Sequence, residues 1–210
     1  MSVRTTALLM MIGLGGTFLL RTLNSVWPAL YASPLLARLV AIWFLVASLF
    51  ALSFFWSVQS AWQGGGRMHL EAASRLATMG AVLAVFLRLR NFVSTLQEAG
   101  TGVPSATREI VPFLELIAAL ALFWFFYRVH VELADRILGT RGAVMGSGIF
   151  SLVAFLGFLV PIVPNIPREL AQLTGFLVLF SVLLGLLAVG GLLRFLNFVR
   201  RDPQALTEGR

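Results

Sequence analysis

Charged side chains inside long apolar stretches are the residues of this chain best suited to chemistry. Glu115 interrupts the run Phe113 to Ile117, and Arg88 lies near the end of the preceding apolar stretch. An ionisable group in a membrane helix is costly unless it is paired, so it marks an ion, proton or solute path by default. Glu115 fits a cation- or proton-binding role. It also fits an ion pair with Arg88, because the two stretches predict neighbouring antiparallel helices, and the ion pair is the favoured interpretation.

A second polar set precedes that apolar stretch. Glu71 and Arg75 are spaced i, i+4 with the acid first, which favours an ion pair within one helix. With Ser74 and Thr78 they form a polar helix face, which fits a self-satisfied pair at a helix entrance or the wall of an aqueous path. Glu115, Arg88, Arg75 and Glu71 are therefore the candidates for a transport path or for structural ion pairs.

The two histidines each begin an H-x-E triplet, at His69 to Glu71 and at His130 to Glu132. Two histidines and two carboxylates fit a metal site, and two histidines fit axial ligation of haem. The spacing argues against a metal, because residues i and i+2 of a helix point to different faces. Ordinary interfacial histidines are the favoured interpretation.

Other chemistry is limited by composition. All 16 basic residues are arginine and cysteine is absent, which excludes lysine Schiff bases, disulfides and thiolate metal sites. We find no catalytic motif, assign no catalytic residue and infer no cofactor. An enzymatic function is therefore the less favoured hypothesis.

The elements that must position these residues are membrane helices. The chain is 59% hydrophobic and only 12% charged, whereas soluble domains carry about 25% charge. Its apolar residues form runs near the roughly 20 residues that a spanning helix needs. The runs predict an all-α, polytopic integral membrane protein, a single domain of residues 1–210 with six spans at about 5–21, 36–58, 70–93, 110–128, 142–163 and 170–198.

Small residues predict where these helices pack closely. Gly142 and Gly146 form a small-xxx-small pair, and Gly13 and Gly16 lie in the first span. Such residues let helix backbones approach within one chain, or else dock a homodimer or a larger complex. The aromatic run Phe123 to Tyr127 is expected to form a lipid-facing and interfacial belt.

The two halves of the chain are faintly similar. Residues 42–49 resemble 149–156, and 87–93 resemble 193–199. This raises the hypothesis of internal repeats 1–98 and 108–210, joined by the loop 94–109. Three spans in each half would make the repeat an inverted one, as in many transporters; the alternative is a duplication that only enlarged a helical bundle.

Six spans place both termini on one side of the membrane. Arginines near the span ends number nine on that side and six on the other, which favours cytoplasmic termini by the positive-inside rule. We expect membrane lipids as partners, and a homo-oligomer or a larger membrane complex; nucleic acid is not expected.

Two function classes follow. The first is a small transporter or channel for a small solute or ion. The second is a non-catalytic structural subunit of a larger membrane complex, for example a respiratory or photosynthetic one.

Overall fold

Six long apolar helices make up most of the computed structural model, which describes residues 1–27, 33–63, 65, 67–96, 105–159 and 174–207. All six are long and apolar enough to cross a membrane. The chain is thus a polytopic α-helical membrane protein. The helices are α1 (Val3–Val26), α2 (Pro34–Trp62), α3 (Met68–Leu96), α4 (Ser105–Leu133), α5 (Thr140–Leu159) and α7 (Thr174–Arg201), followed by the short α8 (Gln204–Thr207).

Local sequence explains several helix ends. The side chain of Ser2 caps α1 by accepting a hydrogen bond from the backbone N–H of Thr5. Pro34 occupies the first turn of α2, where its missing N–H costs nothing. Gly139, just before α5, has a φ of 90°, which favours glycine. Most helices extend beyond the apolar runs that predicted them. The expected loop 94–109 was wrong at both ends, because residues 94–96 belong to α3 and 105–109 belong to α4. Residues 97–104 of that loop, and 160–163 and 170–173 of the last two expected spans, lie outside the described residues.

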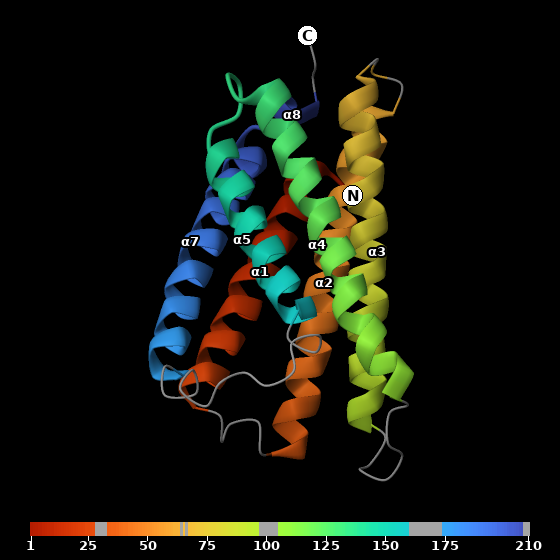
Figure 1. Cartoon of the computed structure of the whole chain (residues 1–210). Helices are drawn as coiled ribbons and strands as arrows, with labels where there is room; N and C mark the ends of the chain where they lie inside the picture. The colour runs from red at the N-terminus through yellow and green to blue at the C-terminus, as the bar shows by residue number, and fades with distance from the viewer. Residues whose placement is uncertain (28–32, 64, 66, 97–104, 160–173, 208–210) are drawn as a thin grey trace.

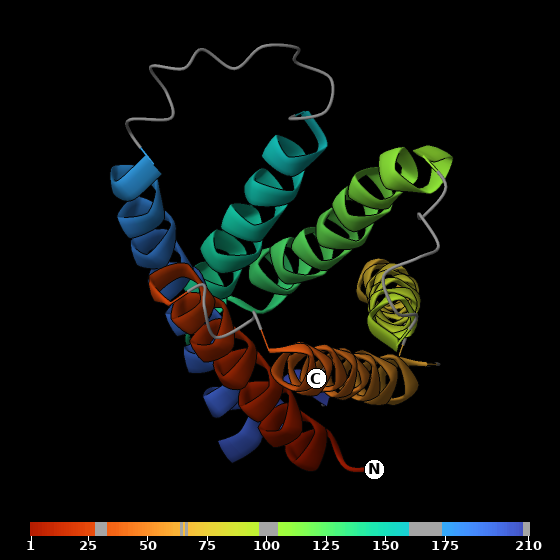
Figure 2. The ribbon, with the colours of Figure 1, turned by 90° about the horizontal axis from the view of Figure 1, so that it is seen from below.

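The helices form a closed ring in chain order. Each packs against the next, and α1 packs against α7 to close the ring. Figure 1 shows neighbouring helices running in opposite directions, with both termini at the same end of the bundle. We call this the terminal end and the other the distal end. In Figure 2, seen from the distal end, α4, α5 and α7 spread apart toward the viewer.

The packed core lies in the terminal half of the ring. Its largest fully buried side chains include Phe54, Phe55, Phe125 and Phe195, and the rings of Phe55 and Phe125 meet edge to face at 5.1 Å. Trp62 stacks on Phe125, and its Nε1–H donates to the carbonyl of Leu206 at 2.8 Å. The short α8 therefore closes this end of the ring.

The aromatic run on α4 was only partly understood from the sequence. Phe125 and Phe126 are 0% and 2% exposed and belong to the core, whereas Trp124 and Tyr127 face outward. The expectation of a lipid-facing belt was therefore wrong for the two inner rings. The reason is the helical period, which turns adjacent residues about 100° apart and so divides a run between two faces.

The structure does not show the inverted repeat. The helices follow one another around the ring in a single rotational sense, which Figure 2 makes visible. A two-fold axis in the membrane plane would turn the first half over and reverse that sense for the second half. The ring order therefore lacks this symmetry, and the similarity between residues 1–98 and 108–210 stays a prediction about sequence alone.

Candidate functional site: a cavity in the distal half

A cavity of about 190 Å³ lies between α1, α2 and α3. Its lining includes four small residues: Gly13 on α1, Ala47 and Ser48 on α2, and Ala84 on α3. Ser48 lies halfway along α2, so the cavity reaches the middle of that helix.

A second cavity of about 400 Å³ adjoins the first. The two share three lining residues, Arg21, Ala84 and Arg88, and the second extends between α4 and α5 as far as Gly157. We call the pair the distal cavity. It is lined by five helices drawn from both halves of the chain.

The distal cavity contains an ion pair. Arg88 Nη2 lies 3.8 Å from Glu115 Oε1, and the two side chains are 27% and 40% exposed. That distance is too long for a hydrogen bond, so the attraction is electrostatic only. Each group therefore retains hydrogen-bonding capacity toward a molecule in the cavity.

A second arginine faces the same cavity. The guanidinium carbons of Arg21 and Arg88 lie 5.9 and 5.8 Å from the centroid of the Phe44 ring, within the range of cation–π attraction. Neither Arg21 nor Phe44 is among the residues predicted to form the site. The available signal in the sequence was that Arg21 directly follows the apolar run Ala7 to Leu20. In the structure α1 continues to Val26, so Arg21 lies inside the helix.

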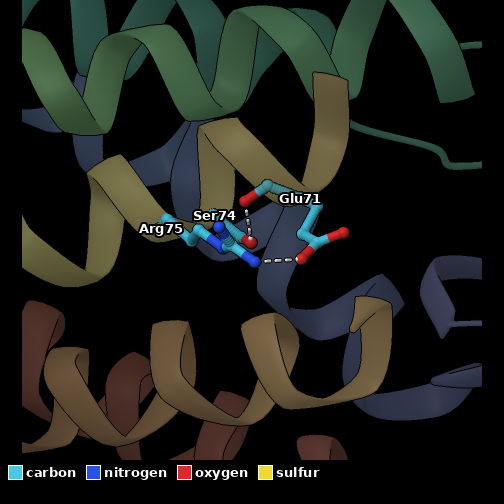
Figure 3. A network of polar contacts seen from close by, with 3 residues as sticks. All are labelled: Glu71, Ser74 and Arg75. Carbon is cyan, nitrogen blue, oxygen red and sulfur yellow. Dashed lines mark hydrogen bonds and ion pairs between the residues drawn. The ribbon is translucent and has the colours of Figure 1, made fainter. Parts of the chain in front are cut away.

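Glu71 and Arg75 lie elsewhere. They form an ion pair near the start of α3, thirteen residues before Arg88, and Ser74 Oγ donates to the carbonyl of Glu71 at 2.8 Å (Figure 3). The side chain of Arg75 is 59% exposed and borders an outer groove between α2 and α3. The structure thus separates the four candidates into two pairs, and only Arg88 and Glu115 line the distal cavity.

The two histidines lie near the terminal end. His69 is exposed in the first turn of α3, and His130 is half-buried with Nδ1 2.9 Å from Thr140 Oγ1. Within the described residues, no group of three or more histidine, aspartate or glutamate side chains is placed to hold a metal ion. A hydrogen-bonding role for His130 is what the geometry supports.

The four glycines singled out in the sequence make contacts within the chain. Gly142 meets Gly191 backbone to backbone, and a Cβ on Gly146 would come within 2.3 Å of the carbonyl oxygen of Ala188. A Cβ on Gly13 would press on Ala47, and one on Gly16 would overlap the ring of Trp43. These residues bring α5 against α7 and α1 against α2.

Comparison with protein-family models, with curated protein sequences and with solved structures finds no match for this chain.

Proposed function

We propose that this protein is a small transporter or channel that moves a small solute or ion through the distal cavity. In this proposal the termini are cytoplasmic, so the cavity receives its solute from the opposite side of the membrane. The proposal rests on one observation: a cavity that reaches the middle of α2, is lined from both halves of the chain and contains a charged pair.

The asymmetry of the bundle supports this proposal. The terminal half is closed by aromatic packing and by α8, whereas the distal half contains the cavity. In this proposal the distal cavity opens to the side opposite the termini, and the packed terminal half keeps ions from leaking through the bundle. An ion pair within the bilayer is expensive to keep, so its position in the cavity indicates a functional role.

The four glycines bear on the alternative of a structural subunit. That reading depended on glycine faces turned toward a partner, and Gly13, Gly16, Gly142 and Gly146 are used instead for contacts between helices of this chain. No specific observation favours the subunit over the transporter.

Flux into liposomes tests the proposal. The purified full-length protein would be reconstituted, and the uptake of labelled sodium, chloride, phosphate and glycerol compared with protein-free liposomes. At least one of these is expected to enter faster. Glu115→Gln removes the one carboxylate among the described lining of the cavity, and we expect the rate to change about tenfold, which corresponds to about 1.4 kcal/mol. It should fall for a cation and rise for an anion, because the cavity becomes more positive.

Glu132→Gln is the matched control. Glu132 lies on the same helix and also pairs with an arginine, Arg128, but outside the distal cavity. Solute uptake by the Glu132→Gln variant should be as fast as by the unmodified protein. The transport proposal is wrong if none of the four solutes enters faster than in protein-free liposomes, and the role of Glu115 is wrong if both variants behave alike.

A further inference from the structure

A groove of about 630 Å³ lies on the outside of the ring, over α7 and the turn between α4 and α5. It is distinct from the distal cavity, since the two share no lining residue. Its upper part, near the terminal end, is polar and carries Arg141 and Arg194. Its lower part is apolar and carries Leu186 and Leu187.

The two arginines give the groove its charge. Arg141 begins α5, Arg194 lies in the last third of α7, and both are exposed. In the part of the chain that the structure describes, neither of the two arginine side chains makes a hydrogen bond or an ion pair. The groove also carries one carboxylate, Asp135, so the two cations outnumber the acidic group. This end therefore attracts an anion.

The apolar part of the groove runs along the helix in the direction that a lipid acyl chain takes in a membrane. Leu187 lies seven residues before Arg194, which places it about 10 Å deeper along the helix. Leu186 and Leu187 are 51% and 66% exposed, so they face the bilayer. A cationic end at the membrane surface above an apolar wall matches the order of a phospholipid, phosphate first and acyl chain below.

Glycine forms the floor of the groove. Gly190 and Gly191 both line it, and a Cβ on Gly190 would meet no atom within 4 Å. The space above Gly190 is therefore open. Behind it, Gly191 packs directly against Gly142, which joins α5 to α7, the two helices that carry the arginines.

We propose that this groove is a specific site for one anionic phospholipid. The lipid phosphate lies between Arg141 and Arg194, and one acyl chain lies over Gly190 and along Leu186 and Leu187. The same groove of a second protein copy would bring two arginines and one carboxylate, so an excess of positive charge would remain between the copies. An anionic phospholipid matches both parts of the groove, its phosphate at the two arginines and its acyl chain at the two leucines.

Native mass spectrometry tests this site. The full-length protein in detergent would be delipidated and titrated with phosphatidylglycerol or, separately, with phosphatidylcholine. We expect one phosphatidylglycerol to bind about thirtyfold more tightly to the unmodified protein than to the double variant Arg141→Gln, Arg194→Gln. Arg201→Gln, which removes an exposed arginine from the end of the same helix, is the control and should bind like the unmodified protein.

Two further arms identify the ligand. Gly190→Leu fills the floor without changing charge and should weaken phosphatidylglycerol binding, whereas glycerol 3-phosphate, which has no acyl chains, should not displace the lipid. The proposal fails if phosphatidylcholine binds as tightly, if the double variant keeps its affinity, or if glycerol 3-phosphate competes at equal concentration. A dimer that dissociates in Gly190→Leu would also overturn it in favour of a second copy.

Discussion

Gly191→Ala is expected to destabilise the protein by about 1–3 kcal/mol, the usual cost of forcing extra volume into a close-packed contact. The new Cβ would lie 2.2 Å from the carbonyl oxygen of Gly142, which is backbone and cannot rotate away. To relieve the overlap, α5 and α7 must move apart. Alanine is the better helix former by about 1 kcal/mol, so any observed loss understates the steric cost.

Gly190→Ala is the matched control for this prediction. The two glycines are adjacent on α7, and the Cβ added to Gly190 would meet nothing within 4 Å. Thermal unfolding in detergent should show Gly190→Ala at or above the stability of the unmodified protein and Gly191→Ala below it. Equal unfolding temperatures would mean that α5 and α7 do not pack at these residues.

Trp62→Ala is expected to have the largest effect on stability, about 3–5 kcal/mol. The side chain is 3% exposed, stacks on Phe125 with ring centroids 5.8 Å apart, and donates to the carbonyl of Leu206. Its removal leaves a void in the aromatic core and leaves α8 without its hydrogen bond. The terminal end of the ring should then lose its closure.

Two variants make this prediction specific. Trp62→Phe keeps an aromatic ring but loses the N–H, so it should lower the free energy of unfolding by only about 1 kcal/mol. This variant should remain folded even if the alanine variant does not. Trp56→Ala removes the same side chain from a position on α2 that is 62% exposed, and it should change the unfolding temperature little. The closed aromatic core is contradicted if Trp56→Ala and Trp62→Ala are equally destabilised.

The six helices were predictable because lipid imposes a simple rule on sequence. A spanning helix must satisfy its own backbone hydrogen bonds and present apolar side chains, so each helix appears as an apolar run. The runs did not define the helix ends: α3, for example, continues past Val93 to Leu96. Polar residues beyond an apolar run can continue the same helix, which composition alone does not reveal.

The candidate site was only half predictable. The pairing of Arg88 with Glu115 followed from their positions on neighbouring antiparallel helices. The separation of Arg75 from that pair did not, because the spacing of residues along a helix does not say which helix face meets the interior of the ring. Arg21 was missed for the same reason: it joins Arg88 at Phe44 only because α1 lies against α2.

The accessibility of introduced cysteines tests the central claim. This claim is that the distal cavity opens to the side opposite the termini, whereas the terminal half is closed. The chain has no cysteine of its own, so single variants can be compared directly. Ser48 lines the distal cavity at the middle of α2, whereas Ser74 is 0% exposed in the terminal half. The reagent is 2-sulfonatoethyl methanethiosulfonate, which does not cross membranes.

In sealed vesicles of both orientations, Ser48→Cys should be labelled from the side opposite the termini and protected from the other. Ser74→Cys should be labelled from neither side, yet react fully after denaturation. The account is contradicted if Ser48→Cys is unreactive, if it reacts from the side of the termini, or if Ser74→Cys is labelled as fast as Ser48→Cys.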